Sequence, residues 1–366
     1  MKTQYLIPVV AILLVVSVSG CVGFDGFKSW FGPTQATVEQ TPDILITTNQ
    51  RTIPNPPILA DSEFTVMFTL KNQDQTQSLR NVGVKLYDWG VCNPVTESGV
   101  PQFLPDSDDW YIGDGFFLRT FDEFFNLEEK VIEFNLMAPD NQRIGNIETD
   151  CPVKWEVNYT FSSRSQDDFT AISKERKREF DVSGTSWTGT NQAQYVGIGP
   201  VKMYFDFKTP MPVQSESSIQ FGITVVDKGS GIYPKIEKNT MFIKVPKEWV
   251  ENVDDATTAC TTGFQLVGKI DASSTAPAGY TPVSGGTGSI TALAVYAHVE
   301  DGYVVYTNDK DISLYNRESS EIICRFKAPD LDTAGVPEKS YFISANITDY
   351  DYRLLGSQTI HIKPSV

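Results

Sequence analysis

Apolar and polar residues alternate with a period of two along most of the chain after residue 42. The alternation is clearest in residues 64–70, 82–87 and 153–161, where apolar side chains occupy every second position. This pattern is typical of antiparallel strands with one buried and one solvated face. Only Ala171 to Phe180 is a candidate helix, and its run of charged residues suits the outer face of an edge strand equally well. The pattern therefore predicts an all-β protein.

The strand pattern occurs twice. Two late segments recur at offsets of 190 and 188 residues, and an early segment recurs at an offset of 156 residues. The difference means that the second copy carries about 34 extra residues between its early and late strands. Many of these extra residues are expected in 272–288. The aligned pairs are Val131–Asp140 with Glu321–Asp330, both ending in Ala-Pro-Asp, Val153–Tyr159 with Tyr341–Ile347, and Ser62–Asn72 with Ser218–Lys228. We expect two tandem β-sandwich domains, at 44–182 and 195–366, joined by a polar linker at 183–194.

The N-terminus has the pattern of an export signal. Lys2 precedes an apolar run from Tyr5 to Val18, and small residues follow before Cys21. Val18-Ser19-Gly20-Cys21 resembles the lipobox of prokaryotic lipoproteins, which implies cleavage of residues 1–20 and lipid on Cys21. The alternative is an uncleaved anchor, because Tyr5–Phe24 is long enough to span a bilayer as a helix. Cleavage makes 21–43 a tether, and both alternatives place the folded part outside the cytoplasm, anchored to the membrane.

The opening strands of the first predicted domain also resemble a known family. Glu63–Asn72 ends in Lys-Asn, and Asn81-Val82-Gly83-Val84 opens the next strand. Both features resemble the opening of archaeal and bacterial CARDB-type surface domains, which are immunoglobulin-like. The resemblance covers about half of 44–182 and less of 195–366. It implies immunoglobulin-like sandwiches, a secreted or membrane-anchored location and no catalytic residues.

Composition and charge exclude several functions. The chain of 366 residues carries 30 Lys and Arg against 46 Asp and Glu, a net charge of −16, so a general nucleic-acid partner is not expected. Its two histidines, His298 and His361, lie in strand-like segments without a catalytic motif beside them. We expect no enzyme and no cofactor, although two carboxylates of a glycoside hydrolase would leave no sequence motif.

Cysteine usage fits an exported protein. Apart from Cys21, four cysteines remain: Cys92, Cys151, Cys260 and Cys324. An even number outside the cytoplasm favours disulfides. Of three possible connectivities, only Cys92 with Cys151 and Cys260 with Cys324 keeps each bridge inside one predicted domain. Four buried free thiols are the alternative.

Two asparagines and a cluster of acidic residues are further candidate sites. Asn158 and Asn346 begin Asn-X-Thr triplets on the polar phase of their strands, so both are expected to face outward as possible glycosylation sites. An acidic cluster offers hard oxygens to Ca²⁺, although a solvated turn explains it as well. Its members are Asp106, Asp108, Asp109 and Asp114.

The same region is rich in aromatic residues. Trp110 and Tyr111 open a stretch that continues to Phe125, which indicates core packing or, if exposed, a contact surface for a sugar or a protein. The sequence thus predicts a non-catalytic structural, adhesive or spacer protein of the cell surface, whose partners are surface proteins or glycans. The alternative is capture of a carbohydrate or peptide through the aromatic and acidic patch of the first domain.

Overall fold

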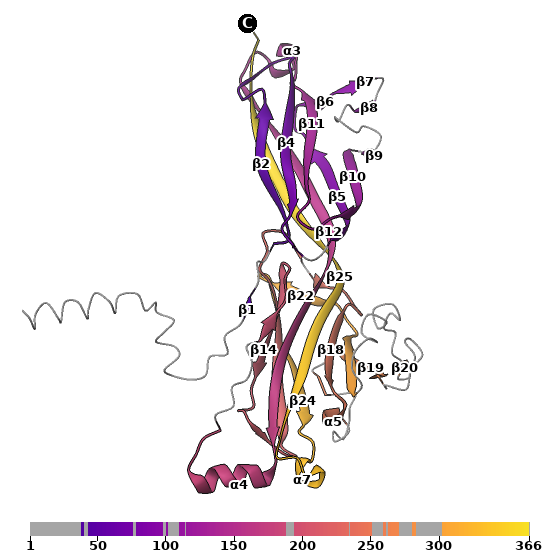
Figure 1. The fold of residues 1–366 in the computed structure, drawn as a ribbon. Coiled ribbons are helices and arrows are strands. Elements are labelled where there is room, and N and C mark those ends of the chain that lie inside the picture. Colours follow the sequence, from indigo (N-terminus) through magenta and orange to yellow (C-terminus); the bar gives the residue numbers. More distant parts are fainter. Residues whose placement is uncertain are drawn as a thin grey trace, which may run out of the picture.

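The structure is a computed structural model. It describes residues 38–39, 43–75, 78–97, 100–101, 110–113, 115–187, 194–233, 235–250, 259–260, 263–270, 280–282 and 302–365. The chain is elongated and all-β, with two β-sandwich lobes on either side of a waist (Figure 1). Lobe 1 contains the described residues within 44–161 and 350–363, and lobe 2 contains the described residues within 163–347.

Lobe 1 is a sandwich of two antiparallel sheets. Its first sheet has the order β2-β4-β11-β6, and its second sheet continues from β25 through β12, β5 and β10 to β9. Phe68 of β4 stacks on Trp155 of β12 at a ring distance of 4.7 Å, so the alternating apolar positions form the core between the sheets. The bounds are β2 Leu45–Ile53, β3 Ile58–Leu59, β4 Glu63–Asn72, β5 Leu79–Asp88, β6 Asn93–Pro94, β7 Thr96–Glu97, β8 Val100–Pro101, β9 Trp110–Gly113, β10 Phe116–Phe124, β11 Glu129–Met137, β12 Thr149–Ile172 and β25 Glu338–Lys363.

Lobe 2 repeats this plan. One sheet contains β14, β16 and β24 with the short strands β23, β22 and β17, and the other continues from β12 through β25, β18, β21 and β19 to β20. Phe326 of β24 contacts Trp249 and Tyr306 across the sandwich. The bounds are β1 Val38–Glu39, β13 Tyr195–Val196, β14 Val201–Phe207, β15 Val213–Gln214, β16 Ser218–Asp227, β17 Lys235–Ile236, β18 Met241–Pro246, α5 Lys247–Val250, β19 Phe264–Ile270, β20 Tyr280–Pro282, β21 Tyr303–Asn308, β22 Ile312–Tyr315, β23 Glu318–Ser319 and β24 Ile322–Lys327.

Two very long strands connect the lobes. β12 has 24 residues and β25 has 26, and they pair antiparallel from one end of the molecule to the other. At about 3.3 Å per residue each spans roughly 80 Å. Their register shifts only at the waist, between Phe161 and Ser163. The lobes therefore share one continuous sheet, in which further strands join β12 in lobe 1 and β25 in lobe 2.

The same order of elements occurs in both halves of the chain. β11 is followed by Asp140, the N-cap of α3 (Asn141–Ile144), and then by β12; β24 is followed by Asp330, the N-cap of α7 (Leu331–Ala334), and then by β25. The last strand of each half extends into the opposite lobe (Figure 1). The exact division at 183–194 stays a prediction, but residues 350–363 pair within lobe 1 rather than lobe 2.

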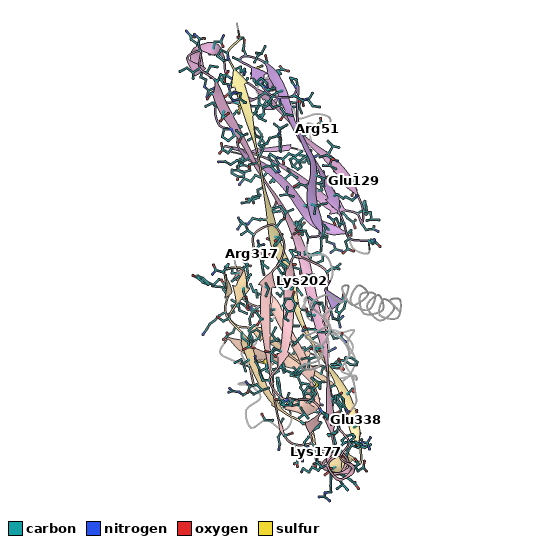
Figure 2. All side chains as sticks on the ribbon, turned by 90° about the vertical axis from the view of Figure 1, so that its left-hand side faces the viewer. Arg51, Glu129, Lys177, Lys202, Arg317 and Glu338 are labelled. Carbon is teal, nitrogen blue, oxygen red and sulfur yellow. A yellow bond between two sulfur atoms is a disulfide. The ribbon has the colours of Figure 1, made fainter. Side chains whose placement is uncertain are left out.

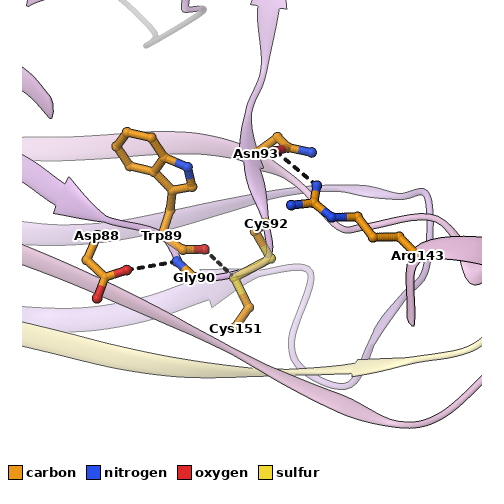
Figure 3. The surroundings of a disulfide bond; sticks show 7 residues. All are labelled: Asp88, Trp89, Gly90, Cys92, Asn93, Arg143 and Cys151. Atoms are coloured by element: carbon orange, nitrogen blue, oxygen red, sulfur yellow. Dashed lines mark hydrogen bonds between the residues drawn. A yellow bond between two sulfur atoms is a disulfide. The ribbon is translucent and has the colours of Figure 1, made fainter. Parts of the chain in front are cut away.

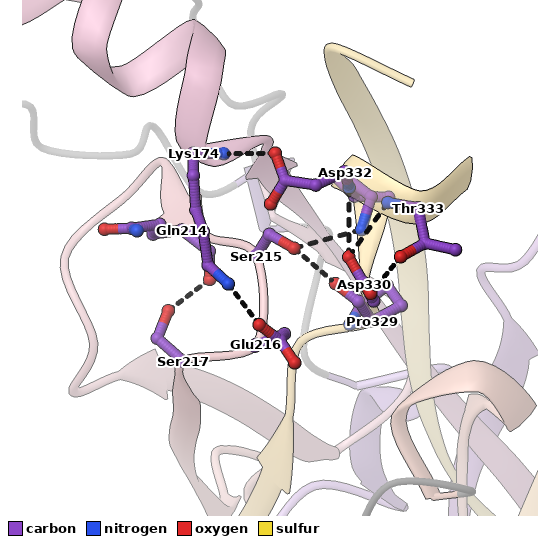
Figure 4. Close-up of polar contacts among 10 residues, drawn as sticks. Lys174, Gln214, Ser215, Glu216, Ser217, Pro329, Asp330, Asp332 and Thr333 are labelled. Carbon is purple, nitrogen blue, oxygen red and sulfur yellow. Dashed lines mark hydrogen bonds and ion pairs between the residues drawn. The ribbon is translucent and has the colours of Figure 1, made fainter. Parts of the chain in front are cut away.

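The charged segment after β12 is a helix and not an edge strand. α4 covers Lys174–Ser183 and begins after Ser173, whose side chain accepts a hydrogen bond from Arg176 N–H. Lys174 N–H donates to Asp332 of α7 at 2.9 Å, and its ammonium pairs with Glu216 (Figure 4). These bonds hold α4 and α7 together at the far end of lobe 2. Among the described helices, none is both long and apolar enough to cross a membrane.

An ion pair between a buried carboxylate and a half-exposed guanidinium lies at the waist. The Asp227 side chain, 2 % exposed, pairs with Arg317 at 3.0 Å and accepts a hydrogen bond from the Tyr352 hydroxyl at 2.9 Å. Burial raises the pKa of Asp227 although these partners favour the charged carboxylate. The described chain enters lobe 1 at Asp43. The Asp43 side chain accepts a hydrogen bond from Ser230 N–H at 3.0 Å, and Ser230 lies in the loop that follows Asp227. Figure 2 shows Arg317 close to the middle of the molecule.

Candidate functional site

Along most of β11, lobe 1 has a sheet edge that no described strand covers. β11 pairs with β4 over its whole length, whereas β6 covers its other side only at Leu136 and Met137. Val95 N–H donates to Asn135 C=O from that side, and Glu128 C=O accepts from Asn72 on the β4 side. Since backbone groups alternate along a strand, the N–H and C=O of Val131 and Glu133 point away from β4. No strand in the described part of the chain pairs with them.

A bulge in β2 hollows the face beside this edge. The β2–β4 register shifts between Thr48 and Arg51, and Asn49 there has a φ of 53°. The next residue, Gln50, donates to Ser357 C=O at 2.9 Å, which holds the bulged backbone against β25. The result is a groove of about 1060 Å³, which we call the β11 groove. Its lining includes Arg51, Met67, Arg119, Lys130, Val131 and Glu133.

The β11 groove is cationic on a strongly anionic protein. Arg51, Arg119 and Lys130 line it, against Glu133 as the single carboxylate among its described lining residues. Lys130 lies 4.6 Å above the ring of Phe121 and 3.3 Å from a Glu128 oxygen, so packing holds its ammonium at the groove. Arg119 lies over the same ring at 4.9 Å.

The floor of the groove mixes apolar and polar groups. Arg51 Nε–H donates to the Met67 sulfur at 2.9 Å, and Val131 is 50 % exposed beside them. A groove with positive rims, a mixed floor and backbone groups that no described strand pairs is suited to binding an extended anionic chain. No group of three or more His, Cys, Asp or Glu in the described ranges is placed to hold a metal ion.

The predicted aromatic and acidic patch falls largely outside the described residues. Trp110 and Tyr111 begin β9, opposite Arg119 and Leu118 of β10, so their backbone borders the same edge of lobe 1. Their side chains, and the Ca²⁺ candidates Asp106, Asp108, Asp109 and Asp114, lie outside the described part. Farther along this stretch, three phenylalanines are buried in the core and Phe125 is 57 % exposed. The buried three are Phe117, Phe121 and Phe124.

The four cysteines form the two predicted disulfides. Cys92 is joined to Cys151 and Cys260 to Cys324, and all four residues are buried. In lobe 1 the disulfide joins the segment after β5 to the beginning of β12 (Figure 3). Arg143 of α3 donates to Asn93 beside this bridge at 3.2 Å. Cys21 lies outside the described residues.

One of the two candidate glycosylation asparagines differs from expectation. Asn346 is 4 % exposed and its Nδ2 is buried without a hydrogen-bond partner, so the expectation that it faces solvent is wrong. The reason is that β18, its neighbour, is buried on both faces, including Phe242 opposite Asn346. In the folded chain this Nδ2 is therefore out of reach of a glycosyltransferase. Asn158 is half-buried with a buried Oδ1, and glycosylation there stays a prediction.

One histidine has acidic neighbours that no motif indicated. His361 of β25 lies 3.1 Å from both Asp150 and Glu148, on the exposed surface of lobe 1. Hydrogen bonds to the two carboxylates raise the pKa of His361. The sequence did not indicate these neighbours of His361, because Asp150 comes to lie opposite His361 only through the pairing of the distant strands β12 and β25. His298 lies outside the described residues.

Comparison with known proteins adds little. No protein-family model and no curated protein matches the chain. Two solved structures are similar over 87 % of it. One is a "Putative membrane anchored protein" of Corynebacterium diphtheriae, with 7 % identity, 91 % of that chain covered and a TM-score of 0.23. The other is the Enterococcus faecalis MSCRAMM ACE, which binds its ligands by the collagen hug model, with 10 % identity, 95 % covered and a TM-score of 0.22. At these values neither likeness bears on function.

Proposed function

We propose that this protein is a membrane-tethered component of the cell surface with a structural, adhesive or spacer role and without catalytic activity. The observation that carries the proposal is the pair β12 and β25, which run through both lobes. Two sandwiches on a flexible linker would reorient freely, whereas a shared sheet of this length makes them one stiff body. Stiffness over roughly 80 Å is what a spacer or a displayed adhesive surface requires.

The N-terminal sequence supports the location. The lipobox-like Val18-Ser19-Gly20-Cys21 and the CARDB-type strand openings both favour an exported, anchored protein. The two disulfides agree with an oxidising compartment. The described chain starts beside the waist, where β1 pairs with β13, rather than at either end of the rod. A tether through residues 22–37, up to about 55 Å long when extended, would let either lobe point away from the membrane.

Surface location is tested in cells that carry a C-terminal epitope tag. The tag is expected to be accessible to antibody on intact cells, and Cys21→Ser is expected to prevent lipid attachment. Retention of an accessible Cys21→Ser protein at the membrane would favour the uncleaved anchor over the lipoprotein. A tag that becomes accessible only after lysis would contradict the proposal itself.

A second candidate function is ligand capture by lobe 1, and the β11 groove is the observation that favours it. The patch at Trp110 and Tyr111 borders the same edge through β9. Replacing both residues by Ala is expected to weaken binding of carbohydrate or peptide ligands while the melting temperature is unchanged. Unchanged binding would exclude this patch.

A further inference from the structure

The open edge of β11 offers main-chain partners to an incoming strand. The outward N–H and C=O groups of Val131 and Glu133 border the β11 groove, and no described strand occupies that side. An extended peptide placed there would form ladder bonds with both residues, as in strand addition to a sheet edge. Sugars and other chains without a peptide backbone cannot reproduce this alternating donor and acceptor pattern.

Side chains around the edge define what such a peptide would carry. Side chains of a strand alternate between two faces. An added strand would therefore point every second side chain toward the opening between the two sheets of lobe 1, which we call the mouth. Lys130 and Arg119 lie at this mouth, one from each sheet. The remaining residues of the peptide would face the outer surface, where half-exposed Val131 and then Glu133 lie. Acidic residues therefore match one face, and an apolar and a basic residue match the other.

We propose that the β11 groove binds an extended peptide segment of a partner protein, with acidic side chains at every second position, by strand addition to β11. Charge complementarity supports this occupant, because Arg51, Arg119 and Lys130 outnumber the carboxylates beside them, Glu133 and the Glu128 partner of Lys130, on a protein with a net charge of −16. An anionic polysaccharide fits less well. The single aromatic residue among the described lining side chains is Phe68, which is 0 % exposed and offers no ring for a sugar to stack on.

The proposal goes beyond the role of a stiff surface protein and does not depend on it, since binding is measured on the purified protein. The probe is a fluorescent peptide with the pattern acidic, apolar, acidic, basic, acidic, and binding is followed by fluorescence anisotropy at low and physiological salt. Controls are the same peptide with alternate backbone nitrogens methylated, a peptide of scrambled order, and polygalacturonate as an anionic polysaccharide. Methylation on the edge-facing nitrogens is expected to abolish binding, because it removes the ladder donors without changing charge.

Two matched pairs of variants test the edge and the charge separately. Val131→Pro removes an N–H that points away from β4, so the β4 ladder is retained, whereas Val131→Thr keeps the donor. Val131→Pro is expected to weaken binding at least about tenfold and Val131→Thr less than about twofold. Lys130→Glu is expected to weaken it at least about tenfold and to flatten its salt dependence. Lys238→Glu, an equal charge change at an exposed position of lobe 2, is expected to leave it unchanged.

The possible results are distinct. If Val131→Pro does not fold, as judged by its melting curve, the methylated peptide on the unmodified protein decides the question. Equal binding of methylated and unmethylated peptides would overturn strand addition. Tight binding of polygalacturonate that Val131→Pro leaves intact would overturn it in favour of a glycan ligand. No binding of the alternating peptide would also refute the proposal, without affecting the surface role.

Discussion

Asp167 is a carboxylate inside the core of lobe 2, and its removal is expected to stabilise the protein at neutral pH. It lies on β12 opposite Ile343 of β25 and is 2 % exposed. One oxygen accepts a hydrogen bond from Asp168 N–H at 2.8 Å, and the other is buried without a partner. Burial raises the pKa of Asp167 from 3.8 to about 7, opposed by that hydrogen bond.

The size and sign of the effect follow from this shift. Between pH 3.8 and about 7 the unfolded chain ionises Asp167 while the folded chain keeps it protonated, so its contribution to stability is full at low pH and is lost as pH rises. A difference of about three pKa units corresponds to about 4 kcal/mol at pH 7 and above. Asn resembles the protonated acid in shape and charge. Asp167→Asn is therefore expected to raise the free energy of unfolding by about 2–4 kcal/mol at pH 8 and by almost nothing at pH 3.5.

Urea unfolding followed by tryptophan fluorescence measures both values, since Trp155 and Trp249 are buried in lobes 1 and 2 respectively. Asp122→Asn, at an exposed position of β10, is the control for the change in net charge and is expected to have little effect at either pH. An Asp167→Asn variant with the same stability change at both pH values would refute the reasoning, because the effect would then not arise from ionisation.

Three other predictions concern the waist and the tip of lobe 1. Arg317→Ala leaves the buried Asp227 carboxylate without its cation; because Arg317 is 47 % exposed and Tyr352 still donates to Asp227, a loss of about 1–3 kcal/mol is expected in urea unfolding, and no loss would contradict the role of this pair. Gly231→Ala would place a Cβ 2.2 Å from the backbone oxygen of Arg353, so a lower melting temperature is expected, and an unchanged one would show that this contact is loose. The raised pKa of His361 stabilises the fold fully below pH 6.5, and this contribution is lost as pH rises through the folded pKa. His361→Gln is expected to reduce the fall in melting temperature between pH 6 and pH 8; an identical fall would contradict the assigned contacts.

Local pattern was enough to predict the strands and the repeat. Alternation at Phe64–Leu70 marks β4, and the two Ala-Pro-Asp steps mark equivalent turns because Asp140 and Asp330 both cap a short helix. The pairing of cysteines also followed from the domain assignment. The strands and turns depend on neighbouring residues, so the sequence displays them directly; the cysteines, 59 and 64 residues apart, could be paired only because the repeat placed two in each domain.

Features that depend on distant strands were not predictable in this way. A strand that extends from lobe 2 into lobe 1 has the same alternation of apolar and polar residues as a strand confined to lobe 2. The periodicity of β25 therefore does not reveal which lobe its last residues join. Asn346 has the polar phase of an outward residue, yet β18 beside it is buried on both faces. The β11 groove joins Arg51, Arg119 and Lys130 from three strands, and no spacing in the sequence brings them together.

The central claim, that β12 and β25 stay paired through the waist with a single register shift, is tested most directly by amide hydrogen–deuterium exchange. The segments to follow are 159–165 of β12 and 345–352 of β25. Even at the register shift, Thr348 N–H donates to Thr240 and Asp349 N–H to Ser162. We therefore predict that both segments exchange as slowly as the strand interiors of either lobe. Exchange within seconds at the waist, with protected strands on both sides, would show two independent domains on a hinge and would contradict the account.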